Sequence, residues 1–360
     1  MKKFLAFVRA HERRVSTAVF LGGFIIDAVT LTRVDFGWVH ALFSFYLVTA
    51  AMALILMHHF SGMKPDSAAT RKLPINTILP MVTQFVLGGL LSGCLVFYTK
   101  SATLYASWPF LLLLAVVFIG NEVLRKYRER ILFQAGLFFF ALYSYAMFAL
   151  PIALGSISTL IFLGSGVVSV GVFAALLFLM QFIRKDGFEP FARQAGIVAG
   201  SILLVVNLFY FTGILPPLPL ALKDAGVYHS LVRTAEGYEV TEEPRSSWFS
   251  RVSRQTLHLA PGEVPYAFSA VFAPVALETP IVHRWEYYDD AQGGWVTKAT
   301  LPFFIRGGRD AGYRGYSFMR EWVAGAWRVS IETESGATIG YIRFDIETVP
   351  QQPELQTIIK

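Results

Sequence analysis

The sequence is poor in cysteine and in charged residues, and each scarcity excludes a class of protein. Cys94 is the single cysteine among 360 residues, which excludes an intrachain disulfide and a cysteine-based metal cluster. Asp, Glu, Lys and Arg make up only 16% of the chain, whereas hydrophobic residues make up 54%. Because soluble domains carry about 25% charged residues, the excess apolar surface has to face lipid. A purely cytosolic protein is therefore excluded.

The sequence also lacks a catalytic signature. It contains no Gly-x-Ser-x-Gly nucleophile elbow, and its C-terminal histidines, His229, His258 and His283, are far apart along the chain. His283 stands two residues before Trp285 in an apolar strand, which favours a packed core residue over a catalytic one. We therefore favour a non-enzymatic protein and expect neither a metal nor a cofactor.

Long apolar runs dominate the first 215 residues. A helix needs roughly 20 apolar residues to cross a hydrocarbon core about 30 Å thick. Seven segments meet this requirement, so we expect a bundle of seven transmembrane helices. Their expected bounds are 15–32, 37–59, 75–98, 103–123, 131–150, 155–183 and 195–215.

Small residues recur four positions apart in three of these segments. The pairs are Gly89 with Gly93, Ser165 with Ser169, and Gly196 with Gly200. Such small-xxx-small pairs let helix backbones approach closely. We expect them to pack helices within this chain, with contact between subunits as the alternative.

The basic residues between the segments are distributed unevenly, and this predicts the orientation. One side of the predicted bundle collects 15 Lys and Arg residues, whereas the other carries only Arg33 and Lys100. Since basic residues next to the membrane resist translocation, the N-terminal residues 1–14 are expected in the cytoplasm. Seven crossings then place the C-terminal region outside it. The formal net charge of +6 is thereby attributed to cytoplasmic loops and anionic lipid, not to nucleic-acid binding.

A proline-rich segment separates the apolar part from a chain of different character. We expect a linker over residues 216–226, an outer domain over 227–349 and a C-terminal tail over 350–360. Short β-rich runs between Gly and Pro turns predict strands in the outer domain. These runs are 255–259, 281–288, 294–305, 326–332 and 338–346.

The clearest strand signal lies near the end of the outer domain. Apolar and polar residues alternate over 327–331 and again over 342–346, with 334–337 as the turn between them, which predicts a hairpin with one buried face. About 130 residues of such strands, without a convincing helix, predict an antiparallel β-sandwich of immunoglobulin-like size. A small barrel is the alternative.

Several short motifs carry a resemblance to a known family. In the C-terminal part they are VFAP (271–274), HRW (283–285), GGRDAGYRGYS (307–317) and GAWRV (325–329), and they resemble the bacterial domain of unknown function 2914. FLGGF (20–24), ASWPF (106–110) and PPLPL (216–220) are similar to multi-span proteins that carry this domain. The resemblance implies a bacterial inner-membrane protein with its C-terminal domain in the periplasm, and it implies no activity.

A group of polar residues is predicted at the outer end of the bundle. A carboxylate as deep as Asp27 is costly, so it should face the bundle interior with a partner. Arg33, Asp35, His40 and Lys100 fall near the same membrane face and could form a polar cluster with it. The alternative is an Asp27 paired with a hydroxyl or amide of another helix, beside ordinary solvated loop charges.

The richest feature of the outer domain is a glycine-rich loop with arginines and tyrosines. Arg306, Arg309 and Arg314, with Tyr313 and Tyr316, suit an anionic lipid headgroup, a peptidoglycan carboxylate or an acidic patch of a partner. The alternative is a hairpin connection in which Asp310 pairs locally with an arginine.

Two functional hypotheses follow. The first is a membrane-anchored envelope interaction or scaffold protein, a subunit or accessory factor of a larger membrane assembly. Its partners would be the lipid bilayer, other membrane-protein subunits or anionic envelope components. The rival is a transporter or transferase that handles a lipid headgroup or glycan at the periplasmic face. It would use Asp27 and His40, with Arg33 or Lys100 as anion contacts.

Overall fold

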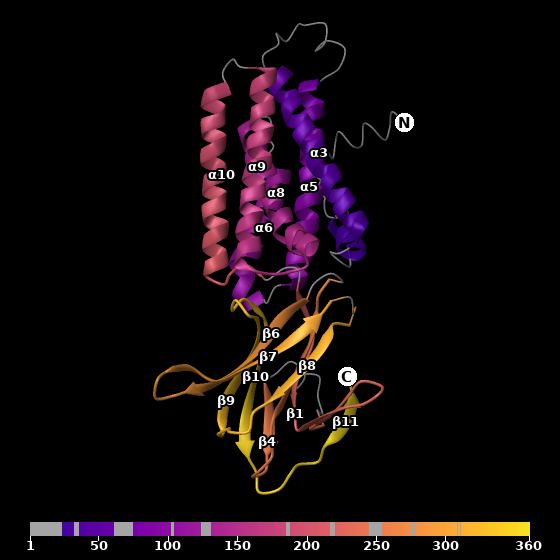
Figure 1. Cartoon of the computed structure of the whole chain (residues 1–360), viewed down its shortest axis with the longest axis vertical. Coiled ribbons are helices and arrows are strands. Elements are labelled where there is room, and N and C mark those ends of the chain that lie inside the picture. The colour runs from indigo at the N-terminus through magenta and orange to yellow at the C-terminus, as the bar shows by residue number, and fades with distance from the viewer. Residues whose placement is uncertain are drawn as a thin grey trace. The chain divides into compact units, whose positions relative to one another are not determined.

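The computed structural model describes most of the chain, and the description falls into two units. The described residues are 24–31, 36–60, 75–101, 104–123, 131–184, 188–216, 220–244, 254–274, 278–307, 309 and 311–360. A helical unit ends at Leu215, and a unit of β-strands begins at Pro216 (Figure 1).

Seven helical segments are described in the first unit. Residues 24–30 are helical, and six long helices follow. These are α3 (Gly37–Phe60), α5 (Ile75–Ser101), α6 (Leu104–Val123), α8 (Ile131–Leu154), α9 (Thr159–Ile183) and α10 (Phe188–Phe211).

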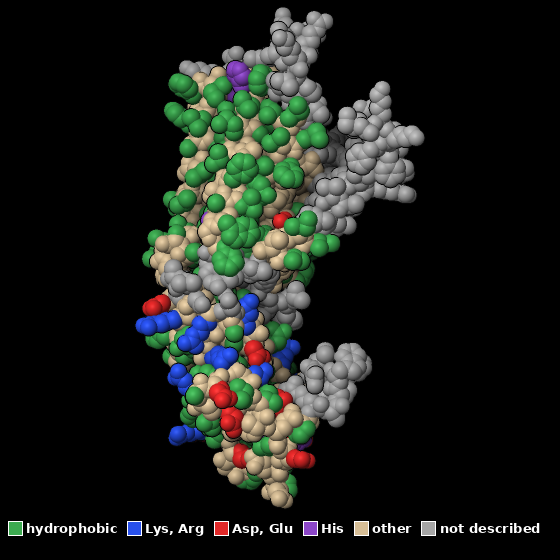
Figure 2. All heavy atoms as spheres, turned by 90° about the vertical axis from the view of Figure 1, so that its right-hand side faces the viewer, with side chains coloured by type: hydrophobic (Ala, Val, Ile, Leu, Met, Phe, Trp, Pro, Cys, Tyr) green, Lys and Arg blue, Asp and Glu red, His purple; other side chains and the backbone are tan. Residues whose placement is uncertain are grey.

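Five of these helices are long and apolar enough to cross a membrane. They are α3, α8, α9, α10 and residues Ile78–Thr99 of α5. Large apolar side chains stand exposed on them, with Phe85, Leu160 and Phe182 each more than 70% exposed, and hydrophobic side chains cover the visible face of the helical unit in Figure 2. A surface of this kind requires lipid. The length and apolar surface of these helices therefore indicate a membrane protein.

The expected count of seven spans is not confirmed by these helices. α6 (Leu104–Val123), whose apolar stretch is Ser107–Asn121, is not among the five helices. The first expected span, 15–32, lies largely outside the described residues, and only its residues 24–31 are seen.

Local capping chemistry moves two helix boundaries from their expected positions. The helix α8 continues to Leu154 and stops before Gly155, whose φ of 64° suits glycine. The helix α9 then begins at Thr159, because Ser158 is its N-cap and accepts a hydrogen bond from the Ile161 amide at 3.3 Å. The loop between the two helices was expected to be part of the sixth span.

The last helix begins seven residues before the expected Ala195 and ends four before the expected Leu215. Glu189 lies in the first turn of α10, where the helix dipole favours negative charge, and Pro190 is tolerated there. Apolar content alone could not reveal this start.

Aromatic and small side chains fill the interior of the bundle around α8. Fifteen residues of α8 are buried, which is more than in α3, α9 or α10. Phe43 of α3 and Phe148 of α8 lie edge to face with ring centroids 6.0 Å apart. Tyr98 of α5 is fully buried and donates a hydrogen bond to the Ser144 carbonyl at 3.1 Å.

The small-residue pairs behave differently from one another. A Cβ added at Gly93 would lie 2.3 Å from the Phe43 ring, and one at Gly89 would lie 2.9 Å from the Tyr46 ring, so this pair lets α3 pack against α5 as predicted. Ser165 and Ser169 are also fully buried. A Cβ at Gly196 or Gly200 meets no described atom within 4 Å, so these two glycines do not mediate close packing among the described helices.

Residues Pro216–Lys360 contain eleven strands, and no helix is seen among those of them that the structure describes. The strands are β1 (Ala221–Tyr228), β2 (Ser230–Arg233), β3 (Tyr238–Glu242), β4 (Gln255–Leu259), β5 (Tyr266–Phe272), β6 (Glu278–Asp289), β7 (Gly294–Arg306), β8 (Tyr313–Phe318), β9 (Gly325–Thr333), β10 (Thr338–Thr348) and β11 (Gln356–Ile359). The predicted hairpin is confirmed, because β9 and β10 pair as antiparallel neighbours.

The strands form three sheets that pack in layers. A five-stranded sheet has the order β4-β10-β9-β6-β7, and two three-stranded sheets have the orders β1-β5-β8 and β11-β3-β2. Trp285, Trp327 and Phe344 of the five-stranded sheet pack with Val227 and Ala267 of the β1-β5-β8 sheet. The two sheets therefore lie face to face, as in a sandwich.

The third sheet covers the other face of the β1-β5-β8 sheet. Leu231 and Val240 pack there against Phe268 and Ala270 of β5. Every residue of β5 from Ala267 to Phe272 is buried, because β5 is the middle strand of the middle layer. The third layer was not predicted from the sequence. The expected wholly antiparallel arrangement is also wrong, because β10 pairs with β4 in parallel.

Two expected segment boundaries differ from the observed strands. β1 begins at Ala221, inside the segment 216–226 that was expected to be a linker, and pairs with β5. The expected tail over 350–360 contains β11, which pairs with β3. Both strands pair with partners that are distant in sequence, so local patterns gave no sign of them.

These boundaries predict which fragment folds alone. Residues 220–360 should fold in water as a β-rich unit, because the three hydrophobic clusters lie largely within them. Residues 227–347, the core of the domain expected from sequence, should not, because they lack β11 and most of β1. Far-UV circular dichroism and cooperative urea unfolding of both fragments provide the measurement. Equal cooperativity of the two fragments would contradict the assigned roles of β1 and β11.

Candidate functional site

The membrane carboxylate is paired with a hydroxyl of another helix. Ser92 of α5 donates a hydrogen bond to Asp27 Oδ2 at 2.6 Å, and Ser92 is buried. This is the partner that the cost of a carboxylate at this depth requires.

The described contact of His40 is with another helix. His40 Nδ1 lies 3.1 Å from the Tyr145 hydroxyl of α8, and its ring lies against those of Tyr145 and Phe148. Arg33, Asp35 and the Lys100 side chain lie outside the described residues. The polar cluster at the outer end of the bundle therefore stays a prediction.

The arginine loop connects β7 to β8 and does not gather its arginines at one point. Arg306 ends β7 and pairs with Glu278 of β6 at 3.1 Å, and both side chains are mostly exposed. The Arg309 guanidinium lies 5.5 Å from the centre of the Tyr313 ring. Asp310, the expected local partner, lies outside the described residues.

The alternation of β8 separates the remaining residues of the predicted site. Successive side chains of a strand point to opposite faces, so Tyr313 shares a face with buried Ser317, whereas Arg314 and Tyr316 belong to the other face. On that other face the Tyr316 ring lies 6.0 Å from the ring of Tyr238 in β3. The five residues thus occupy at least two faces, and a single binding surface made of all of them is not observed.

His283 and two serines form a group whose residue types could serve catalysis, but the group is buried between the sheets. His283 is fully buried, with Nε2 2.7 Å from Ser269 Oγ and Nδ1 2.8 Å from Ser317 Oγ. Burial lowers the pKa of His283 from 6.5 to about 3, so that the imidazole is neutral. As predicted, this histidine is a core residue.

His229 and His258 share one carboxylate, that of Glu243. Glu243, which follows β3, lies 3.0 Å from His229 Nε2 and 2.7 Å from His258 Nδ1, and it accepts a hydrogen bond from the His258 backbone amide. Burial raises the pKa of Glu243, but these hydrogen bonds outweigh burial and bring the pKa below its ordinary value. Within the described part of the chain, no three His, Cys, Asp or Glu residues have a geometry that could hold a metal ion.

An ion-paired network on the outer face of the five-stranded sheet was missed by the sequence analysis. Arg328 of β9 makes two hydrogen bonds to Glu286 of β6, at 2.7 and 2.8 Å, and Ser330 donates a third to the same carboxylate. Arg284 pairs with the buried Glu332 in the neighbouring register. The signal was present as alternating charges along β6 and β9, and the network fixes the register of these two strands.

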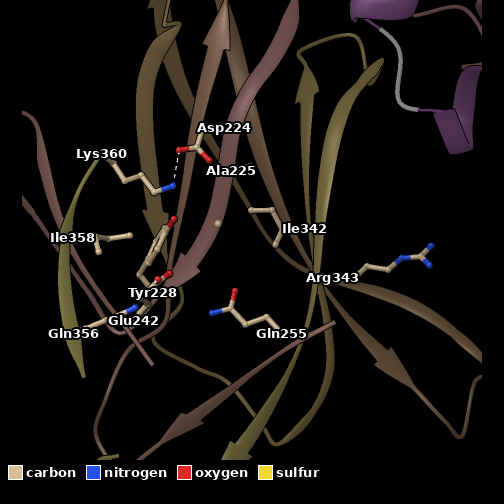
Figure 3. Close-up of a pocket in the computed structure, with 11 residues that line it drawn as sticks. Asp224, Ala225, Tyr228, Glu242, Gln255, Ile342, Arg343, Gln356, Ile358 and Lys360 are labelled. Carbon is tan, nitrogen blue, oxygen red and sulfur yellow. Dashed lines mark hydrogen bonds and ion pairs between the residues drawn. The ribbon is translucent and has the colours of Figure 1, made fainter. Parts of the chain in front are cut away.

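The β unit also contains a cavity of about 430 Å³ (Figure 3). Its walls come from the edge strand β1 and from β3, β4, β10 and β11, and the volume falls within the range of roughly 300–1,000 Å³ typical of ligand pockets. The polar side chains that reach it are Asp224, Tyr228, Glu242, Gln255, Gln356 and Lys360. Ala225, Ile342 and Ile358 add apolar wall.

One ion pair organises the cavity. Lys360, which follows β11, places its Nζ 2.8 Å from Asp224 Oδ2 of β1, and Tyr228 lines the same cavity beside this pair. Burial lowers the pKa of Lys360, but the hydrogen bond to Asp224 and the nearby Asp224 and Tyr228 groups together outweigh burial, so the pKa lies above its ordinary value and the group is charged. Burial raises the pKa of Tyr228, which keeps its hydroxyl protonated.

Gly226 is what allows Tyr228 to take part. A Cβ at Gly226 would lie 2.5 Å from the Tyr228 hydroxyl oxygen, so only glycine lets the tyrosine fold back along β1 toward Lys360. None of these cavity residues was expected from the sequence, because they come from five strands that are distant along the chain.

The comparisons with known proteins concern mainly the second unit. Residues 278–346 match the family model described as "Protein of unknown function (DUF2914)", which confirms the resemblance inferred from the motifs. The chain therefore carries a DUF2914 domain in its C-terminal region. The matched segment runs from the start of β6 into β10 and contains the Glu286–Arg328 network, whereas most of the cavity wall lies outside it.

Among the curated proteins, none matches the chain. Two solved structures resemble it weakly. A β-glucosidase from Listeria innocua in complex with gluconolactone shows 12% identity and a TM-score of 0.18 over 34% of this chain and only 16% of that chain. The alkylpurine DNA glycosylase AlkC of Pseudomonas fluorescens, bound to DNA containing an abasic site analog, shows 12% identity and a TM-score of 0.22 over 85% of this chain and 97% of that chain. Both TM-scores are too low to support an argument about fold or function.

Proposed function

We propose that the chain is a membrane-anchored binding or scaffold protein of the bacterial inner membrane. Its helices would hold an immunoglobulin-like β-sandwich at the periplasmic face, where the sandwich would contact a further component of a larger membrane assembly. The observation that carries the proposal is the joining of five membrane-competent helices to a β unit that has hydrophobic clusters of its own and an open polar cavity.

The inner chemistry of the β unit favours binding over catalysis. His283 is sealed in the core between two serines, and His229 and His258 are engaged by Glu243. A general base has to reach its substrate directly or through one water, which the burial of His283 prevents. At the surface of the five-stranded sheet, Arg284 pairs with Glu332 and Arg328 pairs with Glu286.

The rival function as a transporter or transferase gains no specific support. Asp27 bonds to a serine of α5 and His40 contacts a tyrosine of α8, which are pairings typical of helix packing. The interior around α8 is filled with aromatic side chains.

The proposed orientation predicts a definite pattern in a fusion experiment. Reporters that are active only outside the cytoplasm should work when fused after Leu215 and fail when fused within residues 64–72. The reason is the distribution of basic residues, 15 on one side against two on the other. Activity of both fusions, or the reverse pattern, would contradict the orientation.

The proposed role in an assembly is tested by copurification. The full chain, extracted from native membranes in mild detergent, should elute with a stable partner at a size above that of its own micelle. A chain truncated after Leu215 should lose this partner while remaining in the membrane, since the partner is assigned to the β unit. Elution of the full chain alone would contradict the scaffold role.

A further inference from the structure

We propose that the cavity of the β unit binds an extended peptide segment that carries a lysine side chain, and that this segment adds to the free edge of β1. The inference rests on the proposed function as a binding module and names the chemistry of its ligand.

The first support is the position of β1 at a sheet edge. Among the described strands, the order β1-β5-β8 gives β1 a strand partner on one side, which is β5. Gln255 of β4 donates its side-chain amide to the Val227 carbonyl at 3.0 Å, so this carbonyl points away from β5. In an antiparallel pair the residues facing outward alternate, and Ala225 therefore also directs its backbone N–H and C=O away from β5, on the side of the cavity that it lines.

The side chain of Gln255 already acts as an adjacent strand would, because it satisfies one outward carbonyl of β1. An extended peptide beside Ala225 would continue the same pattern of hydrogen bonds. Strand addition to an exposed sheet edge is a common mode of peptide recognition, in which backbone bonds give affinity and neighbouring pockets give side-chain specificity.

The second support is the charge of the cavity. Asp224 and Glu242 contribute two carboxylates, and Lys360 contributes one ammonium. Arg343 also lines the cavity, but its guanidinium points away from it (Figure 3). The interior thus carries one excess negative charge, which favours a cation over an anion.

The third support is that the cavity already holds a lysine on an extended segment. β11 is a strand of four residues, three of them exposed, and Lys360 directly after it pairs with Asp224 at 2.8 Å. The second carboxylate, Glu242, accepts a hydrogen bond at 3.2 Å from the neutral amide of Gln356. A lysine ammonium from a bound peptide would find at Glu242 the same kind of carboxylate that Asp224 offers to Lys360.

The apolar wall fits the same ligand. Ile342 of β10 and Ile358 of β11 face the cavity between the charged groups (Figure 3). A lysine buries its aliphatic stem on such surfaces while its ammonium reaches a carboxylate.

The test measures peptide binding to the full chain in detergent micelles by fluorescence anisotropy. The probe is a labelled peptide of seven alternating threonine and lysine residues with both ends blocked. One comparison peptide replaces each lysine with glutamine, and a second keeps the lysines but has N-methylated backbone amides. We expect the probe to bind and both comparison peptides to bind at least about tenfold more weakly, because one loses a charged hydrogen bond and the other loses the strand pairing.

Matched variants locate the binding. Glu242→Gln should weaken binding of the probe at least about tenfold, whereas Glu239→Gln should not, because Glu239 lies on the same strand but outside the cavity. Lys360→Met should strengthen binding, since it removes the internal competitor for Asp224. Arg343→Met, which removes an equal charge directed away from the cavity, should leave binding unchanged.

Several outcomes would overturn the inference. Equal binding of the glutamine peptide would remove the charge recognition, and equal binding of the N-methylated peptide would remove the strand addition. Equal effects of Glu242→Gln and Glu239→Gln would show unspecific attraction, and no binding of the probe to either the unmodified chain or Lys360→Met would exclude the site. Each of these failures leaves the fusion pattern and the copurified partner intact, so they are separable from failure of the proposed function.

Discussion

The β unit should lose about 2 kcal/mol of stability when the pH falls from 7 to 5, because His283 is buried as a neutral imidazole. The side chain is fully buried between Ser269 and Ser317. Trp285 donates its indole N–H to the same Ser317 oxygen at 2.9 Å. A protonated His283 would have to donate from both nitrogens, and Ser317 would then have to accept from two donors at once.

The direction of this pH effect follows from the pKa values of His283 in the folded and in the unfolded chain. In the folded chain the pKa of His283 is about 3, whereas the ordinary value is 6.5. Between these values the unfolded chain binds a proton that the folded chain does not bind, so the free energy of unfolding decreases as the pH falls. The contribution is fully present above pH 6.5, and its loss continues down to about pH 3.

The measurement is urea unfolding of residues 220–360 between pH 7 and pH 5, with the variant His283→Gln as the control. This variant keeps hydrogen-bonding groups but cannot titrate, so it should be less stable at pH 7 and should lose less stability than the unmodified fragment between pH 7 and pH 5. Glu243 and Glu286 have lowered pKa values, but a depressed carboxyl pKa takes effect only below about pH 4.5. A pH slope as steep in His283→Gln as in the unmodified fragment would show that another group is responsible.

The parts of the fold that were predictable from sequence are those whose signal is local. The strand β4 occupies the predicted residues Gln255–Leu259, and the β9–β10 hairpin turns at the predicted place. Alternation of apolar and polar residues reports directly on a sheet with one buried face. The five long helices were likewise visible as continuous apolar runs.

Features that depend on distant pairing were not predictable. β1 is stabilised by β5 and β11 by β3, so both were assigned to a linker and a tail. The residues of the arginine loop are close in sequence, but the alternation of β8 places Tyr313 and Arg314 on opposite faces. Closeness in sequence therefore did not indicate which of them share a face. The cavity is the extreme case, since Asp224 and Lys360 come together only when β11 is in place.

Removal of the Trp327 side chain should cause a large loss of stability in the β unit. Trp327 is 1% exposed and packs edge to face against Trp285 with ring centroids 6.4 Å apart. Its indole N–H also donates to the Val323 carbonyl at 2.9 Å. Trp327→Ala should therefore cost about 3–5 kcal/mol, through the lost burial, the remaining void and the unpaired carbonyl.

Trp295→Ala is the matched control, because it removes the same side chain from the opposite face of the same sheet. Trp295 is only partly buried, and its ring contacts the Arg328 guanidinium at 4.7 Å and the Tyr288 ring at 5.3 Å. The loss of these contacts should cost about 1 kcal/mol. Since a domain is stable by only about 5–15 kcal/mol, urea unfolding of residues 220–360 should show a much lower midpoint for Trp327→Ala than for Trp295→Ala. Equal shifts in the two variants would mean that the five-stranded sheet does not bury the face that carries Trp285, Trp327 and Phe344, and the layered packing of the β unit would have to be abandoned.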